Sequence, residues 1–264
     1  MGGGTRLALV LFALLAGVVA MLPGIERSLL YFPFRLSAAE EVASFPGYAP
    51  VPGAAGDVVA WRRAAAGPVA VVAHGNGGTA SGRDWLATRL VDRGVEPWLV
   101  EYPGYGARRG SPDEAGCVGA VLEAVDQVPL DRPVWLVGES LGSAAVAIAA
   151  SLRPTRVAAV LLITPLPSVH AVASRLFPGL PAFLLADRFD ARAALVGYPG
   201  RVGFLVAGDD EVIPTPLQQA WAADFVGTKA TWVLAGSGHN EIAVTADDAQ
   251  WDAMVGFLGG PTRP

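Results

Sequence analysis

Short apolar runs alternate with helix-length segments through most of this 264-residue chain. The apolar runs are rich in β-branched residues and fall at Val69–Ala73, Trp98–Glu101, Val134–Val137, Val157–Ile163, Val202–Ala207 and Thr231–Leu234. The helix-length segments fall at Ser81–Arg93, Pro112–Gln127, Leu141–Leu152, Pro216–Phe225 and Asp247–Leu258. Continuous apolar strands that alternate with helices are typical of a parallel sheet covered on both faces. The sequence therefore predicts an α/β fold with a mostly parallel sheet.

The chain is long enough for one α/β domain with a single large core, which we expect over residues 26–264. The interval 166–201 is longer than a simple crossover between two strands needs, and it contains the apolar phrase "LFPGLPAFLL". We expect this interval to form a small cap. Sites in parallel sheets lie outside the carboxyl ends of the strands, so the cap would cover that end.

The N-terminus is a separate apolar segment. From Arg6 to Leu22 the chain has no charge after its first residue, and the run stops at Pro23. A bilayer span needs about 20 residues, so the run is short but reaches the lower limit when it is extended to Ile25. We expect residues 1–25 to be a single membrane anchor, with the α/β domain on the extracytoplasmic side. A cleaved signal peptide and a buried core helix stay open as alternatives.

Composition excludes several classes of protein. Charged residues make up 16% of the chain and the net charge is −5, so no basic surface for nucleic acid is expected. The single cysteine, Cys117, rules out an intrachain disulfide and a cysteine-based zinc site. We expect neither a metal nor an organic cofactor.

The phrase Gly138-Glu139-Ser140-Leu141-Gly142 lies where an apolar strand turns sharply into an alanine-rich helix. This context is typical of a nucleophile elbow, in which a strained turn presents a serine hydroxyl. Glycines two residues to either side let the strand and the helix approach closely. We therefore predict Ser140 as a catalytic nucleophile.

A serine hydroxyl needs an oriented general base. Of the three histidines, His239 follows the last predicted strand, whereas His170 falls in the expected cap and His74 precedes the serine. We predict His239 as the base. The acid that orients it should come from the loop after Val202–Ala207, where Asp210 is our choice and Asp209 the alternative.

Acyl transfer also needs donors for a developing oxyanion. One candidate is the backbone N–H of Leu141, which opens a helix. The other comes from the loop "HGNGGT" after Val69–Ala73, where we choose Asn76 and keep Gly75 as the alternative. The same loop lacks the lysine and the spacing of a phosphate-binding P-loop.

These motifs together resemble those of the α/β-hydrolases. "HGNGG", "EYPGYGARRGSPDE", "GESLG", "GDDEVIP" and "GSGHN" occur in that family's order. More narrowly, the chain is similar to small, N-terminally anchored relatives of the dienelactone hydrolases and of the alpha/beta-hydrolase-domain-containing proteins, in which a phrase like "LLYFP" follows an apolar helix. The resemblance implies an eight-stranded sheet, with the cap between strands 6 and 7. It selects Asp210 over Asp209, and it implies that Tyr102 and Tyr105 of "EYPGYG" shape the site, although both could be ordinary core or surface aromatics.

The expected function is that of a serine hydrolase that cleaves carboxylic ester or thioester bonds through an acyl-enzyme intermediate. The expected substrate is a small acyl ester or thioester, and the apolar cap and anchor favour a lipid-like one. Two alternatives stay open: a serine peptidase of the same fold, and a non-catalytic binding protein that keeps the fold.

Overall fold

The computed structural model of the chain describes residues 24, 26–176, 178–179, 181 and 184–259. Within these residues, eight strands form one sheet in the order β1-β2-β4-β3-β5-β6-β7-β8. The strands are β1 (Ala49–Pro52), β2 (Val58–Arg62), β3 (Val69–Ala73), β4 (Glu96–Val100), β5 (Val134–Glu139), β6 (Val157–Ile163), β7 (Arg201–Ala207) and β8 (Lys229–Leu234). β1 and β2 pair in the antiparallel sense, and so do β2 and β4, whereas the remaining pairs are parallel. The prediction of a mostly parallel, eight-stranded sheet is confirmed.

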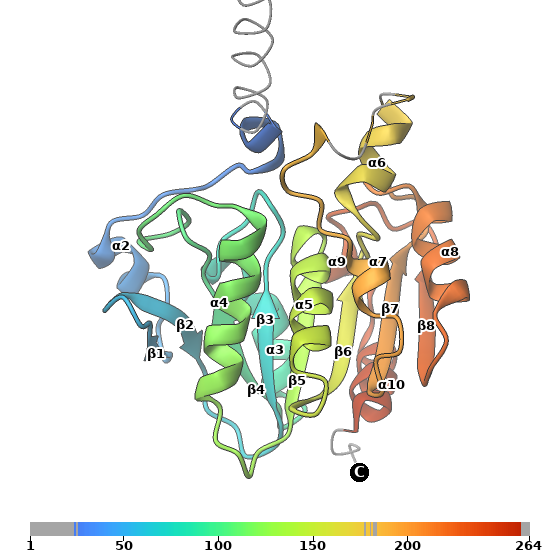
Figure 1. Cartoon of the computed structure of the whole chain (residues 1–264). Helices are drawn as coiled ribbons and strands as arrows, with labels where there is room; N and C mark the ends of the chain where they lie inside the picture. The colour runs from blue at the N-terminus through green and yellow to red at the C-terminus, as the bar shows by residue number, and fades with distance from the viewer. Residues whose placement is uncertain (1–23, 25, 177, 180, 182–183, 260–264) are drawn as a thin grey trace, which may run out of the picture.

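Helices cover both faces of this sheet (Figure 1). They are α2 (Ala38–Ala43), the 3-10 turn η1 (Ser81–Arg83), α3 (Asp84–Val91), α4 (Glu114–Gln127), α5 (Leu141–Leu152), α6 (Val169–Leu176), α7 (Ala191–Ala194), α8 (Thr215–Asp224), α9 (Ile242–Thr245) and α10 (Asp248–Leu258). α4, α5, α7 and α8 contribute to one hydrophobic core, whereas α3 and α10 contribute to a second core. Alternate residues of β3 belong to different cores, with Val71 in the first and Val72 in the second. The sheet is thus buried on both sides, as its continuous apolar strands require.

Most element boundaries follow the sequence prediction. The predicted helix at Leu141–Leu152 and the predicted strand at Val157–Ile163 coincide with α5 and β6. The predicted helix at Ser81–Arg93 is instead divided into η1 and α3, and it ends before Gly94, which has a φ of 72°. A left-handed glycine just past the last turn is a common way for a helix to stop.

The expected cap interval contains α6 and α7, which lie between β6 and β7. α6 stands beyond the carboxyl ends of the strands (Figure 1). That this interval closes over a substrate stays a prediction.

Residues 26–36 run across the same end of the sheet toward α2, and we call this segment the strap (Figure 1). Residues 26–30 of the strap are helical. The anchor predicted over residues 1–25 lies outside the described residues, apart from Gly24. Within the described ranges, no helix combines the length and the apolar character that a bilayer crossing needs.

Candidate active site

Ser140 lies in the sharp turn between β5 and α5 with φ 55° and ψ −119°. A non-glycine residue with positive φ is strained, and such strain is concentrated at functional sites. A Cβ at Gly142 would lie 2.3 Å from the carbonyl oxygen of Ala73, and one at Gly138 would lie 2.3 Å from the carbonyl oxygen of Gly142. The strained turn therefore depends on glycine at both positions.

Hydrogen bonds to neighbouring elements hold this turn in place. The N–H of Ser140 donates to the carbonyl of Ile163 at 2.9 Å, which ties the turn to the end of β6. The hydroxyl of Ser143 donates to the carbonyl of Ser140 at 2.6 Å and accepts from the N–H of Leu166 at 2.9 Å. Ser143 thus joins the turn to the start of the cap interval, a role that its sequence position alone did not reveal.

The structure brings Ser140, Asp210 and His239 together. His239 Nε2 lies 2.9 Å from Ser140 Oγ, and His239 Nδ1 lies 2.8 Å from Asp210 Oδ2. All three side chains are buried, and they follow β5, β7 and β8 at the same end of the sheet. This geometry matches the positions predicted for a nucleophile, a base and an orienting carboxylate, and their roles are taken up as a proposal below.

Asp210 is held as a carboxylate by several donors. Its Oδ1 accepts from the N–H groups of Val212 and Ile213 at 2.9 and 2.7 Å, and its Oδ2 accepts from Gln218 Nε2 at 2.7 Å. Burial by itself would raise the pKa of Asp210, but the hydrogen bond and the charge of His239, together with the two backbone donors, outweigh it and lower that pKa. Sequence reasoning missed Gln218, whose only signal was a polar residue on a predicted helix.

Asp209 does not share this position. Its side chain is exposed, and its backbone N–H donates to the carbonyl of Ser237 at 2.9 Å. Between the two candidate acids, Asp210 is the one that contacts His239.

The loop after β3, residues 74–78, passes beside Ser140. A Cβ at Gly75 would lie 3.3 Å from Ser140 Cβ. Asn76 is fixed at three points: its Nδ2 donates to the carbonyl of Leu30 at 2.9 Å, and its carbonyl accepts from the N–H of Phe32 at 3.2 Å and from the hydroxyl of Tyr105 at 2.6 Å. Leu141 is the first residue of α5, on the other side of Ser140.

A second histidine–carboxylate pair lies beneath this loop. His74 is fully buried, with Nε2 2.9 Å from Glu101 Oε1, and its Nδ1 donates to the carbonyl of Gly75 at 2.7 Å. The ring of Tyr102 lies 4.2 Å from that of His74, and its hydroxyl donates to the His74 carbonyl at 3.0 Å. Both tyrosines of "EYPGYG" thus contact the loop beside Ser140. The remaining histidine, His170, is half-buried on α6.

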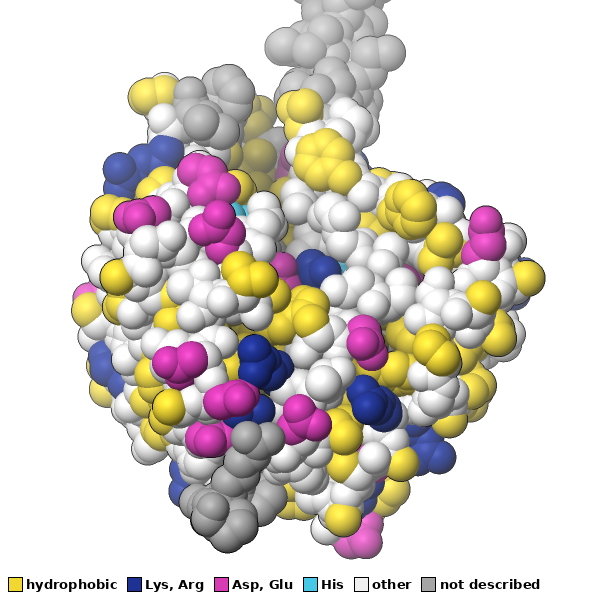
Figure 2. Space-filling view, turned by 180° about the vertical axis from the view of Figure 1, so that it is seen from behind, with side chains coloured by type: hydrophobic (Ala, Val, Ile, Leu, Met, Phe, Trp, Pro, Cys, Tyr) yellow, Lys and Arg dark blue, Asp and Glu magenta, His cyan; other side chains and the backbone are white. Residues whose placement is uncertain are grey.

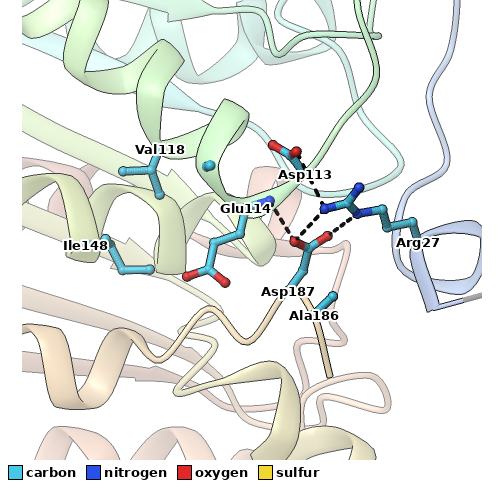
Figure 3. Close-up of a pocket in the computed structure, with 8 residues that line it drawn as sticks. Arg27, Asp113, Glu114, Val118, Ile148, Ala186 and Asp187 are labelled. Carbon is cyan, nitrogen blue, oxygen red and sulfur yellow. Dashed lines mark hydrogen bonds and ion pairs between the residues drawn. The ribbon is translucent and has the colours of Figure 1, made fainter. Parts of the chain in front are cut away.

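A cavity of about 400 Å³ lies where the strap meets α4 and the segment before α7 (Figure 3). Asp187, which is almost completely buried, accepts from Arg27 Nε at 2.9 Å, from the hydroxyl of Tyr31 at 3.1 Å and from the N–H of Glu114 at 3.2 Å. Arg27 also lies 3.5 Å from Asp113 Oδ2, so the ion pairs of Arg27 and the bond from the Glu114 N–H to Asp187 join three segments around this cavity. In the part of the chain that the structure describes, no group of three His, Cys, Asp or Glu side chains could hold a metal ion.

Known proteins resemble this chain in sequence and in fold. A model of the alpha/beta hydrolase family matches residues 70–196. The uncharacterized protein Rv2307c of Mycobacterium tuberculosis is 29% identical over 263 residues, which cover 92% of this chain and 90% of that protein. The lysophosphatidylserine lipase ABHD12 of Xenopus tropicalis is 31% identical over 173 residues, which cover 56% of this chain and 44% of the lipase.

Among solved structures, Est1E from Butyrivibrio proteoclasticus superposes with a TM-score of 0.63 at 14% identity, covering 80% of this chain and 99% of Est1E. A monoacylglycerol lipase from Paleococcus ferrophilus superposes with a TM-score of 0.55 at 17% identity, covering 75% of this chain and 98% of the lipase. At these identities the likeness concerns the fold. Together with the family match over residues 70–196 and the sheet topology, it shows that the chain has the α/β-hydrolase fold.

Proposed function

We propose that the protein is a serine hydrolase that cleaves carboxylic ester or thioester bonds through an acyl-enzyme intermediate. The observation that carries this proposal is the continuous hydrogen-bonded chain from Ser140 Oγ through His239 to Asp210. It lies on a family fold at the carboxyl ends of the strands, where α/β proteins bind their ligands.

In the first half of the reaction, Ser140 Oγ attacks the acyl carbonyl carbon while its proton passes to His239 Nε2. The tetrahedral intermediate collapses when His239 returns that proton to the leaving alcohol or thiol, and the acyl group stays on Ser140. In the second half, water attacks the acyl-enzyme, with His239 again as base, and releases the acid and the free serine. Asp210 holds the imidazole in the required tautomer and balances its positive charge.

The oxyanion of each intermediate is proposed to accept from the backbone N–H groups of Leu141 and Asn76. The carbonyl of Gly75 accepts from His74 Nδ1 at 2.7 Å and from the N–H of Gly78 at 3.1 Å. Because the described peptide bonds include no cis bond, the N–H of Asn76 points away from that carbonyl. Fixing the carbonyl of Gly75 therefore also fixes the direction of the Asn76 donor.

A small acyl ester or thioester with a lipid-like acyl group is the proposed substrate. One relative is named a lysophosphatidylserine lipase, which supports an amphiphilic substrate class. The strap beside the site also exposes large apolar side chains, with Leu29 68%, Phe32 55% and Phe34 60% exposed. Figure 2 shows hydrophobic side chains gathered where the described chain begins.

We propose in addition that residues 1–25 attach the protein to a membrane, with the catalytic domain on the extracytoplasmic side. The uncharged run after Arg6 supports this attachment. Fractionation of the protein with and without residues 1–25 tests it, and recovery of the full chain in the soluble fraction would contradict it.

Covalent labelling tests the chemistry. The full chain should react with a fluorophosphonate, and mass spectrometry should map the adduct to Ser140. Ser140→Ala and His239→Ala should abolish or strongly slow the labelling, whereas Ser151→Ala, a matched change on α5, should not. Equal labelling of Ser140→Ala and the wild type would overturn the proposal, and parallel assays with an ester, a thioester and a peptide amide would define the bond that is cleaved.

A further inference from the structure

Resting on the proposed function, we propose that the strap, residues 26–36, is a positioning element of the catalytic centre that fixes the oxyanion donor of Asn76. The strap contributes no group to the chemistry. It acts on the loop after β3, which lies 46 residues further along the chain.

The contact between the strap and the loop is reciprocal. The side chain of Asn76 donates to the carbonyl of Leu30 at 2.9 Å, and the N–H of Phe32 donates back to the carbonyl of Asn76 at 3.2 Å. These two bonds restrict the side chain of Asn76 and the peptide plane between Asn76 and Gly77. Both groups are joined to the Cα of Asn76, so the bonds hold the atom from which the donor N–H also extends. The hydroxyl of Tyr105, a residue that follows the loop in the sequence, donates to the same carbonyl at 2.6 Å.

The first end of the strap is attached to the segment before α7. The carboxylate of Glu26 accepts from the N–H groups of Ala186 and Asp187 at 2.7 and 3.0 Å. The hydroxyl of Tyr31, whose side chain is 4% exposed, donates to Asp187 at 3.1 Å. Figure 3 shows Arg27 reaching the same carboxylate.

The other end of the strap is attached to the loop after β4. The guanidinium of Arg35 donates to the carbonyls of Arg108 and Gly110 at 3.0 and 2.9 Å. Gly106 exchanges backbone bonds with Phe34 and Leu36, each at 2.9 Å. The strap is therefore held on both sides of Asn76, so its contact with Asn76 has little freedom to shift.

This geometry matters because an oxyanion donor acts only when it is closely placed. Catalytic groups have to be held within about 0.5 Å of their productive position, and loss of one oxyanion donor lowers kcat by about 10²–10³-fold in other hydrolases. A loosened strap would keep the N–H of Asn76 but would allow it a wider range of positions. The expected signature is a lower kcat with little change in KM, since the ground-state carbonyl depends less on this donor.

Two variants of the full chain test the proposal from opposite sides. Asn76→Ala keeps the backbone donor and removes the bond to Leu30. The double variant Glu26→Ala/Tyr31→Phe loosens the strap and leaves the loop and Ser140 unchanged. Tyr48→Phe is the matched control, because it also removes a hydroxyl that donates to an aspartate, here Asp84 at 2.6 Å, outside the strap.

The readouts are kcat, KM and the affinity for a trifluoromethyl ketone, whose adduct with serine places an oxyanion in the same position. For Asn76→Ala we expect kcat to fall about tenfold or more, and for the double variant severalfold, with KM within twofold of the wild type. The affinity for the ketone should fall by the same factor as kcat. When the active sites are titrated, kcat refers to folded enzyme only, so a general loss of folded protein would lower neither value. Tyr48→Phe should match the wild type in all three.

A double variant whose kcat and ketone affinity stay within twofold of the wild type would overturn the positioning role of the strap. So would a loss that falls on KM alone. A wild type that neither hydrolyses esters nor reacts with a fluorophosphonate would instead overturn the proposed function, so the two failures are distinguishable.

Discussion

Gln218 Nε2 lies 2.7 Å from Asp210 Oδ2, the same carboxylate oxygen that faces His239 Nδ1. Gln218 is completely buried on α8, and the same nitrogen donates to the carbonyl of Ile213 at 2.6 Å. The amide is thus held in one orientation, with its donor group toward the acid. Gln218 therefore stabilises both the ionised form and the orientation of Asp210.

Replacement of Gln218 should weaken catalysis through Asp210. Gln218→Met removes a hydrogen bond to a charged group, which is worth about 1.5–3 kcal/mol, so we expect kcat/KM to fall roughly tenfold or more. The donor favours the carboxylate, and its loss raises the pKa of Asp210. The decline of activity on acidification should therefore begin at a higher pH than in the wild type. Gln219→Met, an exposed neighbour on α8, should leave the pH profile unchanged.

The two adjacent aspartates should differ strongly in their effect on activity. Asp210→Asn should lower kcat by about 10⁴-fold, since an amide cannot hold the histidine in the required tautomer. Asp209→Asn should stay within twofold of the wild type, because Asp209 is exposed and does not contact His239. Hydrolysis of a p-nitrophenyl ester measures both, and a larger loss at Asp209 would reverse the assignment.

Alanine substitutions of two glycines should change stability in opposite directions. Gly142→Ala puts a methyl group 2.3 Å from the carbonyl oxygen of Ala73, so we expect a loss of about 1–3 kcal/mol in the free energy of unfolding. Gly119→Ala, at an exposed site on α4 with no atom within 4 Å of the new Cβ, should raise it by about 0.5–1 kcal/mol. Urea unfolding measures both, and equal effects would contradict the close approach at Gly142.

Glu41 should destabilise the fold as it ionises. Burial and the nearby charge of Glu101 raise the pKa of Glu41, which is 5% exposed on α2. The pKa of Glu41 is therefore higher in the folded protein than in the unfolded chain, where it is about 4.3. The stability that protonated Glu41 contributes is fully present below the unfolded-state pKa and is lost as the pH rises through the folded-state pKa. Glu41→Gln should therefore resemble the wild type near pH 4 and exceed its stability at pH 7.

Thermal unfolding at the two pH values measures the effect of Glu41→Gln. Asp131→Asn, at an exposed carboxyl group, is the control and should show no such gain between pH 4 and pH 7. A Glu41→Gln protein that is less stable than the wild type at pH 7 would contradict the prediction.

Much of the fold and of the candidate site could be predicted from local sequence patterns. Ser140, Asp210 and His239 each follow a strand, and the carboxyl ends of parallel strands meet at one edge, so their proximity could be inferred from the order of the residues alone. The division of the predicted helix at Ser81–Arg93 was missed because helix propensity does not reveal where the first turn of a helix adopts 3-10 geometry. Gln218, and the contact of Leu30 with Asn76, were missed for a different reason: they depend on pairing between segments that share no local signal.

The attachment of the strap to the segment before α7 has a consequence for how that segment can vary. Glu26 accepts from the N–H groups of residues 186 and 187, and Glu114 accepts in the same way from residues 188 and 189, at 2.7 and 3.0 Å. Both carboxylates therefore recognise main chain and not side-chain identity. The exposed positions Ala186 and Arg188 can accept any residue other than proline without loss of these bonds. The segment before α7 can thus vary in sequence while its main chain keeps one geometry.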